Sequence, residues 1–268
     1  MAEPKVPKGE HPARILFWDI DRSSMSIGPD DRIEQAFGFK PRRFVDPKVL
    51  STTFEKFHRL TPIVRKDDLG EFQDEVYRTH PSIDVEVYDS ISEMVVKDRL
   101  QIRKEKNGAK ISLPDRSDVT DRAEDLIMKQ CATDTSFIAM AHIKSEKDEE
   151  LGMIKYLPVL PGRLAQEVGR RFDCIFYARV ITKGKAQNEF VWQGIMDERY
   201  NAKCRVPSVV ELMQSNGGTM PQDYGLLFNK ARESGFVHLK ILILGDSGAG
   251  KTHSLRTLTG VTFPDRNK

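Results

Sequence analysis

The residues with the clearest chemistry lie near the C-terminal end, where the chain reads GDSGAGKT over residues 245–252. This is the pattern G-x-x-x-x-G-K-[ST], whose glycines let consecutive backbone N–H groups curl around phosphates. Lys251 is expected to reach the terminal phosphates, and the Thr252 hydroxyl to ligate Mg²⁺. The residues expected to bind nucleotide are Gly245, Asp246, Ser247, Gly248, Ala249, Gly250, Lys251, Thr252 and His253.

The flanking segments supply the setting that such a loop requires. The apolar run from His238 to Leu244 predicts a strand before the loop. Residues 251–258 predict a helix after it, whose positive end points at the anion. Average residue frequencies give a chance match to the pattern in roughly one chain of this length in a hundred. We therefore expect the chain to bind ATP with Mg²⁺ as its cofactors.

Only residues 253–268 follow Thr252, so the other parts of a nucleotide site must lie upstream or be absent. Asp89 ends the predicted strand 83–89 and is the candidate for the acid that holds Mg²⁺ through water; Asp89-Ser90 is equally typical of a helix N-cap. Asp19 and Asp21 end the predicted strand 14–21, and one of them could orient the attacking water or simply cap a loop.

His142 ends a third predicted strand, 136–142, and could sense the γ-phosphate, although a lone histidine there is often structural. The carboxyl ends of parallel strands meet at one edge of a sheet, where ligands bind. We therefore expect the strand that ends at Leu244 to lie in the middle of the same sheet as these three strands. A phosphate loop needs an acid from a neighbouring strand, so Asp89 should lie within about one water of Thr252. A separation beyond about 8 Å would assign the loop to an incomplete, separate unit.

Several segments outside the phosphate loop resemble a known family. They are WDIDRSS, VEVYDSISEM, FIAMAHIKSEKDE, IKYLPVLPGRLAQEVGRRFDCIFYA and NAKCRVP. Together they resemble the short, phage-encoded ATPases with a RecA-type core that are grouped with recombination and single-strand annealing proteins. In that family the phosphate loop comes first, whereas here it comes last. The resemblance therefore implies a circularly permuted order, with a join near QSNGGTMPQDYG.

The resemblance also implies roles for individual residues. Asp89 matches the magnesium-site acid, and His142 matches a polar sensor. Asp21 falls where RecA-like proteins carry a catalytic glutamate, and the shorter acid implies slow hydrolysis. Lys203 and Arg205 match a Lys-x-Arg that reaches a neighbouring subunit's nucleotide, which implies a homo-oligomeric ring or filament. A solvated strand end is the alternative reading of this pair.

Single-stranded DNA is a further possible partner. The loop SEKDEELGMIKY, residues 145–156, falls where RecA-like cores place a DNA-binding loop, yet its acids outnumber its bases. Lys104, Lys106 and Lys110 form a more basic candidate. The mechanism would be backbone neutralisation with aromatic stacking, for which only Tyr156 is nearby. Charge runs of this kind are usually just solvated, so the sequence leaves both readings open.

Strands that alternate with helices predict an α/β fold. We expect a mostly parallel sheet of the RecA-like type, flanked by helices, with an antiparallel hairpin of residues 174–182 and 188–196 at one edge. Residues 1–12 predict a flexible arm, and residues 13–268 a single domain. Within it, 13–206 form the core, 207–235 a linker or join, and 236–268 the phosphate-loop strand and helix.

Composition excludes several classes of protein. The net charge of +2 favours neither nucleic acid nor membrane as an overall partner, and the three scattered cysteines are typical of a reducing compartment. The sequence contains neither a signal-peptide core nor an apolar run of membrane-spanning length. We expect a cytoplasmic protein, in the host cytoplasm if phage-encoded, with no membrane partner.

Other functions stay open. The segment LKILILGDSGAGKTHSLRTLTGVTF also resembles the opening of Rab-like GTP-binding proteins. That reading needs a DxxG loop after the phosphate loop and an NKxD guanine reader; residues 253–268 contain no DxxG, and Asn229-Lys230-Ala231-Arg232 lacks the aspartate. A nucleotide-binding interaction module without turnover is a further alternative.

Overall fold

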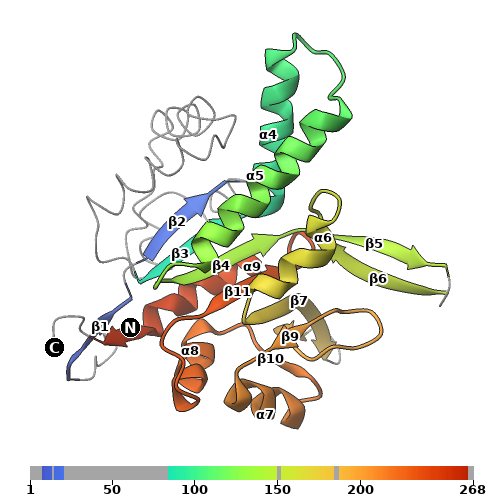
Figure 1. Ribbon diagram of the computed structural model, residues 1–268. Helices are drawn as coiled ribbons and strands as arrows, with labels where there is room; N and C mark the ends of the chain where they lie inside the picture. Colours follow the sequence, from blue (N-terminus) through green and yellow to red (C-terminus); the bar gives the residue numbers. More distant parts are fainter. Residues whose placement is uncertain (1–7, 14, 21–83, 150–151, 184–186, 265–268) are drawn as a thin grey trace.

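A computed structural model describes residues 8–13, 15–20, 84–149, 152–183 and 187–264. Its centre is an eight-stranded sheet in the order β10-β8-β7-β11-β4-β3-β2, with β9 paired to β7 (Figure 1). The strands of this sheet are β2 (Ile15–Asp19), β3 (Val85–Asp89), β4 (Ser136–Ala141), β7 (Cys174–Lys183), β8 (Gln187–Gln193), β9 (Lys203–Cys204), β10 (Thr219–Pro221) and β11 (Lys240–Leu244).

The strand β11, which precedes the predicted phosphate loop, lies inside this sheet. It pairs in parallel with β4 on one side and with β7 on the other. Its side chains are apolar in both directions: Leu242 packs on one face of the sheet and Ile243 on the other. A strand covered on both faces belongs in the middle of a parallel sheet. The predicted insertion of this strand among those ending near Asp89 and His142 is confirmed.

The sheet as a whole is mixed. The run β7-β11-β4-β3-β2 is parallel, whereas β8 and β9 pair antiparallel with β7, and β10 pairs antiparallel with β8. The α/β class and the antiparallel hairpin β7–β8 at one edge are confirmed. The expected mostly parallel sheet describes only one part of the observed sheet, because the hairpin continues into β10.

Helices cover both faces of the sheet (Figure 1). One face carries apolar residues such as Met94, Leu126 and Leu164, and the other carries Met213 and Phe228. The first layer consists of α4 (Ile91–Glu105), α5 (Leu113–Cys131), α6 (Leu164–Glu167) and the 3-10 helix η2 (Val168–Arg171). The second consists of α7 (Pro207–Ser215), α8 (Tyr224–Glu233), α9 (Lys251–Ser254) and the 3-10 helix η3 (Leu255–Gly260).

Local sequence explains where the two long helices begin. Ser90 caps α4 by accepting a hydrogen bond from the Glu93 backbone N–H. Ser112 caps α5 by accepting a hydrogen bond from the Asp115 N–H, and the Asp115 carboxylate accepts one from the Ser112 N–H, which completes a capping box. In the described part of the chain, no helix combines the length and apolar character needed to cross a bilayer.

Three sequence-based expectations are wrong in detail. The predicted linker 207–235 folds into α7, β10 and α8, and buries Met220 and Tyr224. The predicted loop 145–156 instead contributes most of β5 (Ile143–Asp148) and part of β6 (Met153–Pro158), which pair in a separate two-stranded sheet. The end of the predicted arm forms β1 (Glu10–Pro12), which pairs with β12 (Thr262–Pro264).

Candidate nucleotide-binding site

The phosphate loop, residues 245–250, connects β11 to α9 and adopts backbone angles that favour glycine. Gly248 and Gly250 have φ of 79° and 85°, in the left-handed region. Gly245 is needed for a different reason, because a methyl group there would lie 3.0 Å from the Ala178 carbonyl oxygen on β7. The glycines of the motif therefore follow from backbone conformation and close approach.

The Lys251 ammonium lies within this loop. Nζ donates hydrogen bonds of 2.8 Å to the carbonyl oxygen of Gly245 and 2.9 Å to that of Asp246. The side chain is only 7% exposed, so its charge is held next to the loop in a setting of reduced solvent screening. An anionic oxygen in the loop would be a stronger acceptor for this ammonium than either neutral carbonyl.

Thr252 and Asp89 meet although 163 positions separate them in sequence. The Thr252 hydroxyl donates a 2.6 Å hydrogen bond to Oδ2 of Asp89, whose side chain is almost fully buried. The predicted proximity is confirmed, which excludes a phosphate loop in a separate, incomplete unit. One detail is wrong: the acid does not come from the strand next to β11, because β4 lies between β11 and β3.

His142 follows β4 directly beside the loop. The Gly245 backbone N–H donates a 3.2 Å bond to the Ala141 carbonyl, and the His142 N–H donates a 3.0 Å bond to Ser92 Oγ. The backbone thus places His142 at the first glycine of the loop, and its role as a sensor stays a prediction. Asp21 lies outside the described residues; β2 ends at Asp19, in register with Asp89.

Lys203 and Arg205 lie away from the loop of their own chain. Lys203 pairs with Ile175 near the amino end of β7, whereas the phosphate loop follows the carboxyl end of the parallel strand β11. Lys203 Nζ donates a 2.7 Å bond to the Gly169 carbonyl. Burial, together with the Arg205 charge, lowers the pKa of Lys203 below its ordinary value. Action on a neighbouring subunit's nucleotide stays a prediction.

The predicted helix after the loop is shorter than expected. Only residues 251–254 form the α-helix α9, and η3 continues it in 3-10 geometry. An anion in the loop would therefore be held by the loop N–H groups and Lys251 more than by a helix dipole. His253 is exposed on α9, and partial desolvation, followed by the Arg256 charge, lowers its pKa below the ordinary value.

Sequence reasoning missed Gln222, which supports the loop, and Tyr224, which is buried close to Ser254 of α9 and to Asp89. Gln222 Nε2 donates bonds of 2.8 Å to the Ala249 carbonyl in the loop and 3.1 Å to the Val191 carbonyl on β8. Tyr224 is fully buried, and desolvation raises the pKa of its hydroxyl, with the Asp89 charge acting in the same direction. Both belong to the segment whose Gly, Pro and polar composition predicts a linker, so no local pattern could have identified them.

We expect Gly250→Ala to lower the free energy of unfolding by about 2–4 kcal/mol. A left-handed alanine costs about 1–2 kcal/mol, and overpacking adds a similar amount, since the methyl group would lie 2.6 Å from Cδ1 of Phe190. Gly260→Ala is the matched control: nothing lies within 4 Å of the added methyl group, so its effect should stay within about 0.5 kcal/mol. Urea unfolding measures both. Equal effects would mean that the loop does not hold this conformation in solution.

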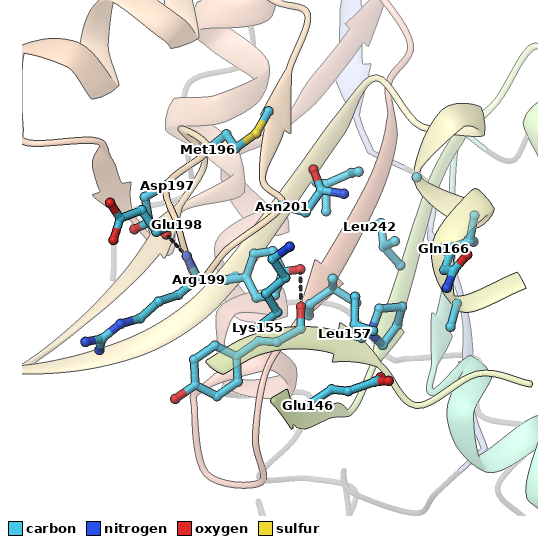
Figure 2. A pocket seen from close by; sticks show the side chains of 18 of the residues that line it. Glu146, Lys155, Leu157, Gln166, Met196, Asp197, Glu198, Arg199, Asn201 and Leu242 are labelled. Atoms are coloured by element: carbon cyan, nitrogen blue, oxygen red, sulfur yellow. Dashed lines mark hydrogen bonds between the residues drawn. The ribbon is translucent and has the colours of Figure 1, made fainter. Parts of the chain in front are cut away.

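A separate cavity of about 560 Å³ opens beside the β5–β6 hairpin (Figure 2). Leu242 and Leu244 of β11 contribute to its lining, and they belong to the core on the α4–α5 face of the sheet. The Tyr177 hydroxyl donates a 2.9 Å bond to the Tyr156 carbonyl at its wall. Acidic and basic groups mix around it, including Glu146, Lys147, Lys155, Asp197, Glu198 and Arg199.

This region bears on the possible DNA contact. Tyr156, the predicted stacking residue, already stacks on Tyr200 with ring centroids 5.1 Å apart, and Arg179 lies 4.9 Å from the Tyr200 ring centroid. In the other candidate, Lys106 is paired with Asp115 at 2.6 Å, while Lys104 and Lys110 are exposed. These residues therefore do not form a site for single-stranded DNA.

No protein-family model, curated protein or solved structure matches this chain. The functional interpretation therefore rests on the residues and on their arrangement.

Proposed function

We propose that this chain is a magnesium-dependent ATPase whose phosphate loop is Gly245–Thr252. The observation that carries the proposal is the hydrogen bond between Thr252 and Asp89. A chance glycine-rich turn has no reason to place the hydroxyl of its final threonine against a buried acid from a distant strand. A magnesium site in a phosphate loop needs that pair, because the hydroxyl ligates the metal and the acid holds it through water.

The donor set fits Mg²⁺. The ion prefers oxygen ligands and keeps several waters, with one or two carboxylates and the substrate phosphates completing its shell. Among the described residues no group of three or more His, Cys, Asp or Glu gathers as a metal site. A magnesium nucleotide site does not require one, since Thr252, Asp89 and the phosphates suffice. The bound ion would neutralise negative charge on the phosphate oxygens.

The arrangement of strands supports a permuted RecA-type core. Of the strands in the central sheet, β11 comes last in the chain but lies between β7 and β4, and β3, which carries Asp89, lies on the far side of β4. Because β1 pairs with β12, the end of the segment 236–268, which carries the phosphate loop, lies beside the start of the segment 13–206. A different chain order could thus connect the same elements without moving them. A role in phage DNA recombination or single-strand annealing, within a homo-oligomer, rests on the sequence resemblance.

Within this proposal each residue has a distinct task. Lys251 and the loop N–H groups bind and orient the terminal phosphates, so that catalysis comes from positioning and charge stabilisation. His142, which follows β4 next to the first glycine of the loop, acts as the sensor of the γ-phosphate. Asp21 orients or deprotonates the attacking water, and its short side chain makes hydrolysis slow.

Calorimetric titration with ATP and Mg²⁺, paired with phosphate-release kinetics, tests the proposal. We expect the chain to bind ATP and to release phosphate slowly. Phosphate release should stop when EDTA removes the metal. Binding without release would indicate a nucleotide-controlled interaction module. No binding of ATP or GTP would overturn the nucleotide-binding proposal itself.

Competition with GTP distinguishes the remaining alternative. The segment Asn229–Arg232, the nearest match to a guanine reader, lies in α8, where Ala231 is buried and Lys230 pairs with Glu233 at 2.8 Å. It offers no acid to a guanine edge, so we expect GTP to displace labelled ATP no better than ATP itself. Tenfold tighter binding of GTP would favour a GTP-binding protein instead.

A further inference from the structure

A large aromatic ring lies exposed beside the phosphate loop. Phe190 on β8 is 41% exposed, and Val180, its partner in register on β7, is exposed to the same degree. A methyl group on Gly250 would lie 2.6 Å from Cδ1 and 3.2 Å from Cε1 of Phe190. The ring therefore contacts the last glycine of the loop while a large part of its surface stays open to solvent.

The position of Phe190 along β8 explains why this ring is exposed. Trp192 lies two positions along on the same face, is fully buried, and packs on Phe176 and Tyr224 at centroid distances of 5.4 and 4.8 Å. Phe190 continues this aromatic row past the edge of the core. A phenyl ring in that position has apolar surface that a flat, apolar ligand face can cover.

Gln222 fixes the ring and the loop relative to each other. Its Nε2 donates to both the Ala249 carbonyl in the loop and the Val191 carbonyl next to Phe190. Its Oε1 would lie 2.8 Å from a methyl group on Gly250, and it has no hydrogen-bond partner in the described ranges of the chain. A buried acceptor without a donor invites an N–H group from a ligand. The same spot thus offers an aromatic face and a hydrogen-bond acceptor.

We propose that Phe190 is the platform on which the base of the bound nucleotide stacks. The inference rests on the proposed function, because the phosphates must occupy the loop for the base to extend from it. A nucleobase matches both features: it has a π-face for the ring and N–H groups on its edge. The nucleoside thereby adds binding energy that a bare triphosphate chain does not have.

The test compares ATP with inorganic tripolyphosphate, each titrated with Mg²⁺ by calorimetry. Phe190→Ala should weaken ATP binding roughly five- to thirtyfold, the lower part of the range for base stacking because the ring is partly exposed. Its affinity for tripolyphosphate should be unchanged. Phe190→Tyr keeps the ring and should retain ATP affinity. Val237→Ala removes an equally exposed apolar side chain near the amino end of β11 and should alter neither affinity.

Each other outcome overturns the inference in a recognisable way. Equal losses for ATP and tripolyphosphate would mean that Phe190 only supports the loop. Unchanged ATP affinity of Phe190→Ala would mean that the base binds elsewhere. Sedimentation of wild type and variant would then show whether the ring contacts a second copy of the chain or only solvent. A wild-type chain that binds tripolyphosphate as tightly as ATP would overturn base stacking but keep the phosphate site. Binding of neither ligand would overturn the phosphate site as well.

Discussion

Lys251→Ala is expected to weaken ATP binding about ten- to hundredfold. The substitution removes a charge-assisted contact to the phosphates, which is worth about 1.5–3 kcal/mol. The same change leaves the Gly245 and Asp246 carbonyls without the donor that now lies between them. Calorimetry with ATP and Mg²⁺ measures the effect, and unchanged affinity would mean that Lys251 only closes the loop.

Lys240→Ala is the matched control for this experiment. Lys240 lies at the other end of β11, and its ammonium likewise donates to backbone carbonyls, those of Gln130, Thr133 and Thr135. Its loss should destabilise the fold, because buried carbonyls lose a donor, while the ATP affinity of the folded protein stays the same. A similar loss of affinity in both variants would point to general destabilisation rather than to a phosphate contact.

The sequence predicts much of the central sheet because its strands have strong local signals. The apolar runs that form β3, β4 and β11 are bounded by polar residues, and the β7–β8 hairpin follows from two such runs around a short turn. The parallel order also follows, since helices separate the strands. The proximity of Asp89 to Thr252 could be predicted only because the carboxyl ends of parallel strands meet at one edge of a sheet.

The predictions that failed concern segments whose structure is decided by contacts distant in sequence rather than by a local pattern. Gly217 and Gly218 both have positive φ and are typical of a linker, yet they form the turn that lets β10 pair with β8. The strand β5 has no apolar alternation because residues 144–147 are exposed, so backbone pairing with β6 alone defines it. Gln222 and Phe190 reach the loop from other elements of the fold, and no local pattern encodes such contacts.

Asp89→Asn and Thr252→Val are expected to lower phosphate release by about a hundred- to a thousandfold, the usual cost of removing a preorganised charge-stabilising group. Each variant also alters the dependence on metal. In the wild type we expect EDTA to weaken ATP binding, because Thr252 and Asp89 fit a hydrated magnesium bound to the phosphates. With either partner removed, ATP should bind about equally with Mg²⁺ and with EDTA.

Asp98→Asn separates this effect from the general cost of changing a buried acid. Asp98 is also buried, but it pairs with Arg122 at 3.0 Å between α4 and α5, away from the phosphate loop. That variant should keep the metal dependence of ATP binding whatever its stability. Asp89 also precedes the Ser90 cap of α4, and a purely structural Asp89 would make Asp89→Asn behave like Asp98→Asn. Retained metal dependence in Asp89→Asn and Thr252→Val would therefore reduce the Thr252–Asp89 bond to a structural contact and remove the observation on which the proposed ATPase rests.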